Sequence, residues 1–195
     1  IMLLGIYFVY QSAGSLRLIA LLESPDRFTR IGAACFMVGF SLKAGVVPLH
    51  TWVADVYGHA PSAISGLLAG VVSKSMLLIL PAISLRLGMS KVELGVFLMS
   101  FCCLNMLVGS LRMLGQRLLR RFLSFSSIAQ TGYLMFGLGI GFTYDLPEAF
   151  SAGLFLFLVI GVMKSLAFLS GGIYEFHIGS QEIERLLGIG HRMPW

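Results

Sequence analysis

Long apolar runs recur along this chain of 195 residues at about the length that a helix needs to cross a bilayer. A spanning helix needs roughly 20 consecutive apolar residues. Lipid leaves backbone polar groups satisfied only in helices or closed barrels, and these runs lack the alternation of barrel strands. The sequence therefore predicts an all-α, polytopic transmembrane helical bundle of about six helices. The candidate spans are residues 1–22, 31–49, 62–85, 92–114, 122–142 and 149–173.

The composition argues against a soluble domain and against a nucleic-acid-binding protein. Charged residues make up 12% of the chain, whereas a soluble domain carries roughly 25%. The formal net charge of +5 is not spread over a surface, because four arginines gather in one connection between two apolar runs: Arg112, Arg117, Arg120 and Arg121. Basic connections favour the cytoplasmic side. We therefore expect this loop to be cytoplasmic, together with residues 51–61 and the polar tail from residue 174.

No motif of a nucleotide-binding, nucleophilic or metal-dependent enzyme is present in the sequence. The three cysteines lie in apolar runs without CxxC or Cys/His spacing, and no P-loop, dinucleotide fingerprint or haem ligand pair occurs. We expect no cofactor and no metal in this chain. The sequence begins with Ile1 inside an apolar run and without a signal peptide, so we also expect it to be a portion of a longer protein.

Three lysines inside the apolar runs are the strongest candidates for function. Lys74 is about two helical turns from either end of its span, Lys164 is also well inside, and Lys43 lies nearer to a span end. A lysine at the centre of a spanning helix costs on the order of 2.5–3.5 kcal/mol, whereas one near an end can extend to the interface. That alternative is open for Lys43 alone. Apolar surroundings bring a lysine within range of proton exchange near neutral pH, so we expect a proton or cation pathway.

Lys43 is followed in the same span by Gly45 and Pro48. A proline removes a backbone donor and clashes with the preceding turn, so we expect the helix to break here. Broken helices at membrane depth direct free amides and carbonyls into a water-filled cavity. The alternative is a proline that only ends the span near the interface. His50 is expected to face the same cavity as a relay or gate, or else to bond a backbone carbonyl.

Other polar residues are candidates for supporting these positions. Asp55 could pair with a lysine or cap the following helix. Ser127 and Gln130 belong to a polar first half of the fifth span, which also contains Ser126, and could line water. Asn105 in the fourth span has the same interpretation, although helix packing is the commoner use of such residues in membranes.

Several segments of the chain occur in the same order as motifs of one family of membrane proteins. These segments are 40–52 (FSLKAGVVPLHTW), Asp55, 60–70 (APSAISGLLAG), Lys74, 125–133 (FSSIAQTGY), 164–168 (KSLAF) and 186–194 (LLGIGHRMP). With them the chain resembles the family that comprises the antiporter-like subunits of respiratory complex I, the Mrp-type cation/proton antiporters and the membrane-bound hydrogenases. The resemblance covers essentially the whole chain, and its long central motif is specific.

The resemblance implies a fold and a set of roles. The spans look like the sixth to eleventh of roughly fourteen helices, with a discontinuous second span and a cytoplasmic loop at residues 112–121. Lys43 matches the lysine at the broken helix, Lys74 the central lysine of the next helix, and Lys164 the lysine of the eleventh helix. These lysines belong to a hydrated polar axis that the family uses to pass protons.

The resemblance also implies partners and a location. Sibling antiporter-like subunits would surround the chain in an energy-transducing membrane, the bacterial or archaeal cytoplasmic membrane. Iron–sulfur, flavin or quinone cofactors are expected only in partner subunits.

Two departures from the family pattern concern continuity of the pathway. Members often carry histidines one and two turns before the last lysine, where this chain has Ile160 and Leu156. Continuity between Lys74 and Lys164 then depends on water or on serines such as Ser165. The family's glutamate that pairs with the broken-helix lysine lies on a helix that precedes this sequence.

Three functions remain open from the sequence. The first is a proton-translocating antiporter-like subunit of a complex I-like respiratory or related redox-driven complex such as NADH:quinone oxidoreductase, with no redox chemistry of its own. The second is a subunit of a Mrp-type sodium/proton antiporter, because the same residues serve both. The third is a structural membrane subunit that does not conduct.

Overall fold

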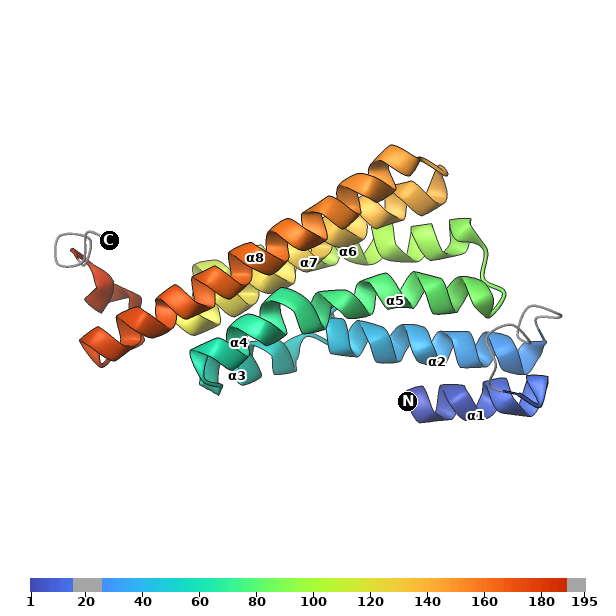
Figure 1. Cartoon of the computed structure of the whole chain (residues 1–195), viewed down its shortest axis with the longest axis horizontal. Helices are drawn as coiled ribbons and strands as arrows, with labels where there is room; N and C mark the ends of the chain where they lie inside the picture. The colour runs from blue at the N-terminus through green and yellow to red at the C-terminus, as the bar shows by residue number, and fades with distance from the viewer. Residues whose placement is uncertain (16–25, 189–195) are drawn as a thin grey trace.

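The computed structural model describes residues 1–15 and 26–188, and this part of the chain is built from helices that run along one long axis (Figure 1). A single isolated bridge between Leu118 and Glu182 is the only β-type pairing within it. The α-helices are α1 (Met2–Ala13), α2 (Arg27–Ala44), α3 (Thr51–His59), α4 (Ser62–Leu67), α5 (Ser73–Arg86), α6 (Lys91–Leu114), α7 (Leu119–Thr143) and α8 (Pro147–Ile178). A π-helical turn, η2 (Leu68–Val72), joins α4 to α5, and a short 3₁₀ helix, η3 (Ile183–Leu186), follows α8.

The predicted all-α membrane bundle is confirmed. Three described helices are long and apolar enough to cross a membrane: the continuous α4–η2–α5 unit (Ser62–Arg86), α6 and α8. α2 and α7 occupy the positions of the second and fifth predicted spans. The first span differs from the prediction, because α1 ends at Ala13. Gly14 there takes a left-handed conformation (φ 62°) and its N–H bonds Tyr10 O, which closes the helix. Residues 16–22 of that span lie outside the described residues, as do residues 189–194 of the tail motif.

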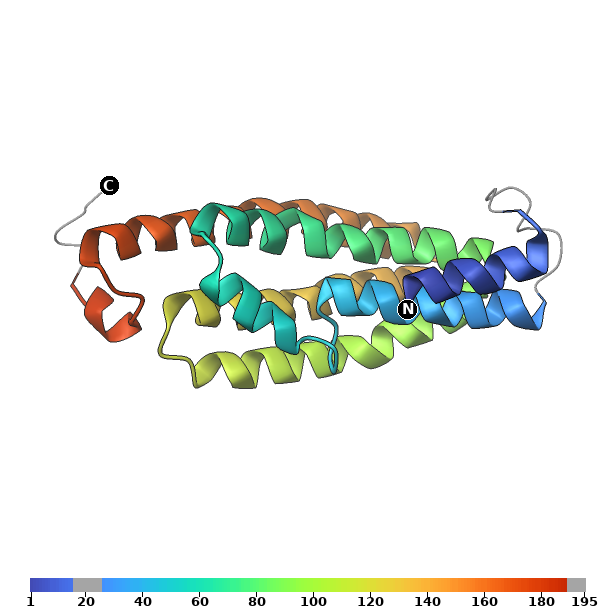
Figure 2. The same cartoon turned by 90° about the horizontal axis from the view of Figure 1, so that it is seen from below.

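α7 is the central helix of the bundle. It packs against α6 along its length, and against α8 and α3, while α2 packs between α1 and α5 (Figures 1 and 2). One buried cluster joins α2, α5, α6 and α7 through residues such as Leu77, Leu98 and Leu134. A second cluster, around Tyr57, joins α3, η2, α7 and α8. The two clusters place every helix that carries a candidate lysine within one packed unit.

The predicted grouping of three connections at one end of the bundle is confirmed for the described residues. Residues 51–61, the arginine-rich loop and the tail as far as residue 188 meet there (Figure 2). Arg121 forms an ion pair with Asp55 at 2.7 Å, and Leu119 N donates to Gln181 O at 2.9 Å. The membrane side on which this end lies stays a prediction.

Close approach of α6 and α7 depends on glycine. A Cβ on Gly132 would lie 2.7 Å from Cys102 O and 3.0 Å from Met106 N, both backbone atoms of α6. A Cβ on Gly109 would lie 2.6 Å from Ala129 N. Small residues allow such contact between helices in lipid, where packing rather than exclusion of water holds helices together. These glycines set the distance between the two helices.

We predict that Gly132→Ala destabilises the bundle, because the added methyl group collides with backbone that cannot move without separating α6 from α7. Overpacking of this kind costs about 1–3 kcal/mol. The thermal unfolding temperature of the purified subunit in detergent measures the effect. Gly115→Ala is the matched control, since a Cβ at this exposed position meets nothing within 4 Å. Equal unfolding temperatures for the two variants would contradict the prediction.

Candidate functional site

Lys74 is buried at the centre of the bundle. It stands in the first turn of α5, directly after the π-turn, and its side chain is 1% exposed. Its Nζ donates a hydrogen bond to Ser127 Oγ on α7. Lys74 is thus enclosed by the bundle, while its depth in the membrane stays a prediction. Its partner is a neutral hydroxyl, and no carboxylate of the described residues forms an ion pair with it.

Lys164 approaches the same helix from another side. It lies in the middle of α8, is 3% exposed, and donates from Nζ to Ser126 Oγ at 2.8 Å. Ser126 and Ser127 are adjacent on α7, so one turn of this helix holds both lysines. The sequence indicates only that this part of α7 is polar. It does not indicate that Ser126 and Ser127 are the partners of the two lysines, because these contacts join distant helices.

Gln130 and Ser165, which were also expected to support the pathway, form no hydrogen bond with either lysine in the described part of the chain. Gln130 is one turn further along and has a buried Oε1 without a hydrogen-bond partner among the described residues. The hydroxyl of Ser165, proposed to help connect the lysines, donates instead to Gly66 O at 3.3 Å and ties α8 to α4. Ile160, at one of the expected histidine positions, is buried (1% exposed). In the described part of the chain, Lys74 and Lys164 are therefore connected through their bonds to adjacent serines of α7.

The helix break after Lys43 is confirmed. Gly45 has a left-handed φ of 77°, Gly45 N bonds Leu42 O at 3.2 Å, and Val46 N bonds Ser41 O at 2.9 Å. This is the Schellman arrangement that terminates helices. The break thus begins at Gly45, before Pro48. Lys43 itself is exposed on the outside of the described bundle and has no hydrogen bond or ion pair within it.

Side chains from other elements satisfy the backbone groups that the break leaves free. Asn105 of α6 is fully buried, and its Oδ1 accepts from Val47 N at 2.8 Å. The indole Nε1 of Trp52 donates to Leu42 O at 2.8 Å. Sequence reasoning assigned Asn105 only to lining or packing. A lone amide side chain in a long apolar run was the signal for it, but its partner could not be known before the fold.

Replacement of Asn105 by leucine is predicted to destabilise the subunit. The Val47 N–H would stay buried without an acceptor, and such an unsatisfied group costs about 1–3 kcal/mol. Thermal unfolding followed by the helical circular dichroism signal measures the loss. Ser100→Ala, an exposed change on the same helix whose hydroxyl bonds its own backbone, should leave the transition unchanged. An Asn105→Leu variant as stable as Ser100→Ala would show that the amide does not hold the break.

His50 and Asp55 line a polar pocket of about 260 Å³ between the helix break and the arginine-rich end. His50 has a buried Nδ1 without a hydrogen-bond partner in the described part of the chain. Asp55 lies within α3 and pairs with Arg121, so the expectation that it pairs with a lysine or caps the next helix is wrong. Arg112 and Gln116 complete the pocket wall.

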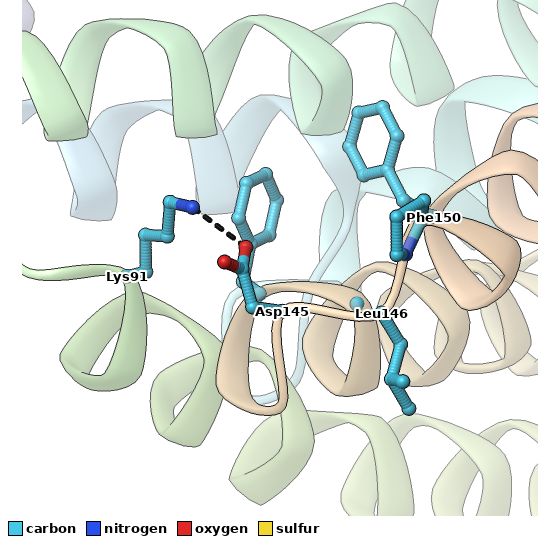
Figure 3. A pocket seen from close by; sticks show the side chains of 7 residues that line it. Lys91, Asp145, Leu146 and Phe150 are labelled. Atoms are coloured by element: carbon cyan, nitrogen blue, oxygen red, sulfur yellow. Dashed lines mark hydrogen bonds and ion pairs between the residues drawn. The ribbon is translucent and has the colours of Figure 1, made fainter.

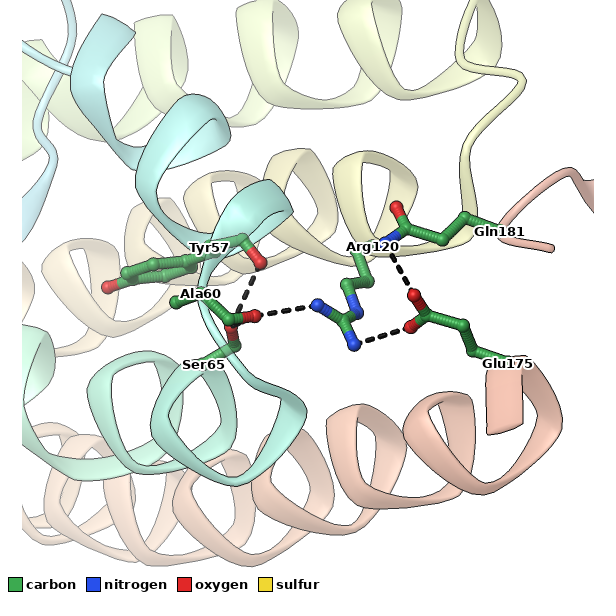
Figure 4. A network of polar contacts seen from close by, with 6 residues as sticks. All are labelled: Tyr57, Ala60, Ser65, Arg120, Glu175 and Gln181. Carbon is green, nitrogen blue, oxygen red and sulfur yellow. Dashed lines mark hydrogen bonds and ion pairs between the residues drawn. The ribbon is translucent and has the colours of Figure 1, made fainter. Parts of the chain in front are cut away.

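A second polar network fastens the same end of the bundle (Figure 4). The side chain of Arg120, 12% exposed, donates to Ala60 O at 2.6 Å and forms an ion pair with Glu175 of α8. Gln181 of the tail donates to the other oxygen of Glu175 at 2.8 Å. Arg120 therefore holds α7, the α3–α4 corner and α8 at fixed positions.

The ion pair that the described residues form at the opposite end is exposed. Lys91 contacts Asp145 at 2.6 Å beside a small pocket of about 220 Å³ lined by Leu146 and Phe150 (Figure 3). Exposed pairs contribute little to stability. Neither residue contacts the buried lysines, and no cluster of metal-ligating side chains occurs in residues 1–15 and 26–188.

Comparison with known proteins agrees with this arrangement. The family described as "NADH:quinone oxidoreductase/Mrp antiporter, TM" matches residues 1–195. This chain belongs to that family. NADH-quinone oxidoreductase subunit N of Geotalea uraniireducens is 31% identical, over 98% of this chain and 41% of that protein. Formate hydrogenlyase subunit 3 of Escherichia coli is 32% identical, over 81% of this chain and 27% of that protein.

A solved structure extends the family assignment to the backbone. The structure titled "membrane-bound sulfane sulfur reductase (MBS), an archaeal respiratory membrane complex" contains a chain with a TM-score of 0.86 and 26% identity. The match covers 99% of this chain and 40% of that one. The chain thus spans less than half the length of these relatives. Its lysines, broken helix and π-turn belong to one antiporter-like membrane unit.

Proposed function

We propose that the protein containing this chain is a proton-translocating, antiporter-like membrane subunit of a complex I-like respiratory or related redox-driven complex. Protons would pass along the buried lysines and water. The observation that carries the proposal is that Lys74 and Lys164 are buried against one turn of α7 and bonded only to serine hydroxyls. A buried lysine with a structural role is normally paired with an opposite charge.

The serine partners suit a group that gains and loses a proton. A hydroxyl can accept a hydrogen bond from an ammonium and donate one to a neutral amine. Ser126 and Ser127 can therefore serve each lysine in both states without a fixed negative charge. Two positive charges held at adjacent residues of one helix repel each other, so a proton arriving at one lysine favours release from the other.

The pocket at His50 supports a route from the arginine-rich end. It opens beside the helix break, and His50, Arg112 and Arg121 line it. We place this end in the cytoplasm, because basic loops favour that side. The membrane would be an energy-transducing one, the cytoplasmic membrane of a bacterium or archaeon.

The partners follow from the same proposal. The relatives named above include subunits of oxidoreductase and hydrogenlyase complexes, so we propose sibling antiporter-like subunits as neighbours. Iron–sulfur, flavin or quinone groups would be held by other subunits.

A Mrp-type sodium/proton antiporter is the second candidate, because the family description names both classes. Co-purification through a tag on this subunit distinguishes them, since only the redox complex brings flavin or iron–sulfur proteins with it.

Lys74→Ala should abolish proton flow through the complex reconstituted in vesicles, because it removes the central protonatable group. Acidification or alkalinisation of the vesicle interior, followed with a pH-sensitive dye, measures the flow. Lys91→Ala is the matched control, since Lys91 lies at an exposed end and pairs with Asp145. Normal assembly of Lys74→Ala with unchanged proton flow would refute the proposal and favour a structural subunit that does not conduct.

Ser127→Ala should slow proton flow without preventing assembly. The change leaves the Lys74 ammonium without its hydrogen-bond partner among the described residues, and the loss of a hydrogen bond to a charged group is worth about 1.5–3 kcal/mol, roughly a ten-fold effect or more. The initial rate of the dye signal measures it. Ser124→Ala on the same helix is the control, because the hydroxyl of Ser124 is buried but bonds only its own backbone at Arg120 O. Equal rates for both serine variants would remove Ser127 from the pathway.

A further inference from the structure

The turn that precedes Lys74 is wider than an α-helical turn. Residues Leu68–Val72 form a π-turn in which Ser73 N bonds Leu68 O. Ser73 Oγ and Tyr57 Oη also lie within hydrogen-bond distance of this carbonyl oxygen, at 2.8 and 3.2 Å, and of each other. Each hydroxyl has one proton to donate, so two of these three contacts are hydrogen bonds at any one time. The Leu68 carbonyl of the π-turn is therefore held by a side chain from another helix, either directly or through Ser73.

Tyr57 belongs to α3, the helix that resumes after the break next to Lys43. Its side chain is fully buried, and its ring meets Trp52 and Phe168 edge-on with centroid distances of 6.1 and 6.0 Å. Trp52 in turn donates to the carbonyl of Leu42, the residue before Lys43. A continuous set of contacts thus runs from the last turn of α2 through Trp52 and Tyr57 to the π-turn.

The geometry explains why this contact matters for Lys74. Successive residues of an α-helix are rotated by about 100°, so a π-turn that reverted to α-helical geometry would turn the following residues relative to α4. α4 is fixed against α8 through Gly66 and Ser165. The reversion would therefore rotate Lys74 away from Ser127. π-turns are found mostly as single turns at functional sites, in agreement with this position.

A buried tyrosine hydroxyl usually has a hydrogen-bond partner whatever its role. Burial alone would therefore account for a bond from Tyr57 to some nearby acceptor. The acceptor here is a carbonyl of the π-turn, the one bonded by Ser73 N, and the second partner, Ser73, directly precedes Lys74. Ring packing against Phe168 does not require either bond. The hydroxyl and the ring of Tyr57 therefore have separable roles.

We propose that Tyr57 is a positioning residue that links the helix break at Lys43 to the π-turn that directs Lys74 toward Ser127. Trp52 forms the first part of this link and the Tyr57 hydroxyl the second. The effect on proton flow rests on the proposed function, whereas the effect on the π-turn does not. Two measurements on the same assembled complex therefore test the two parts separately.

The decisive variant is Tyr57→Phe, which removes the hydroxyl and keeps the ring. In the purified complex, hydrogen–deuterium exchange of the amides of residues 68–74 should become about five-fold faster, as expected for loss of one buried hydrogen bond. The initial rate of proton flow should fall in parallel. Tyr133→Phe is the matched control, because Tyr133 is exposed on α7 (52%) and has no hydrogen bond within the described residues. It should change neither quantity.

Two more variants test each half of the link. Ser73→Ala removes the other hydroxyl at the Leu68 carbonyl, so its effect on exchange should be less than additive with that of Tyr57→Phe. Trp52→Phe removes only the indole N–H and should also speed exchange at residues 68–74. If it affects residues near 42–46 alone, the link does not reach Lys43 and that half of the proposal is overturned.

The remaining outcomes are equally decisive. Unchanged exchange at residues 68–74 in Tyr57→Phe overturns the link whatever happens to proton flow. Faster exchange with unchanged proton flow overturns the positioning role for Lys74. If the unsubstituted complex carries no proton flow, the proposed function fails, while the exchange experiment still decides whether Tyr57 holds the π-turn.

Discussion

The absence of water in the hydrocarbon region is the constraint on which the rest of this structure depends. A backbone group or charge inside the membrane must find its partner within the protein. The helix break at Gly45 meets this requirement with two side chains, because Asn105 accepts from the Val47 amide and Trp52 donates to the Leu42 carbonyl. The π-turn meets it in the same way through Tyr57 and Ser73. The helix break and the π-turn are each hydrogen-bonded to a neighbouring element, so a change in either one also disturbs that neighbour.

α7 brings the helix break, the π-turn and the two buried lysines into one site. Its glycines bring α6 close, which places Asn105 against the break, and its adjacent Ser126 and Ser127 reach Lys164 and Lys74. Arg120, at the start of the same helix, holds the end of α8 and the α3–α4 corner. One helix thus sets the positions of both buried lysines relative to each other. Its polar residues do this without a carboxylate, which would hold the lysines in the charged state.

The sequence predicts the features that depend on local chemistry. Apolar runs locate the helices, Gly45 and Pro48 locate the break, and the depth of Lys74 and Lys164 in their runs predicts their burial. It does not predict features that depend on contacts between distant segments. The π-turn needs Tyr57 from another helix, Asn105 finds its partner 58 residues away, and Asp55 meets Arg121 rather than a lysine because α3 lies against α7. Gly14, by contrast, is a local signal for the end of α1 that hydropathy alone does not register.

The three lysines have different surroundings, and along the proposed route they would therefore have different roles. Lys74 and Lys164 are closed in by α7, so their charge states depend on each other and on neutral hydroxyls. Lys43 is exposed on the outside of the described bundle, beside the break, so its charge responds to whatever covers that face in the assembled protein. The contacts through Trp52 and Tyr57 are the described path by which a change at that face reaches the turn before Lys74. A subunit that only filled space between neighbours would need neither the break nor the π-turn, since continuous helices satisfy their own backbone at lower cost.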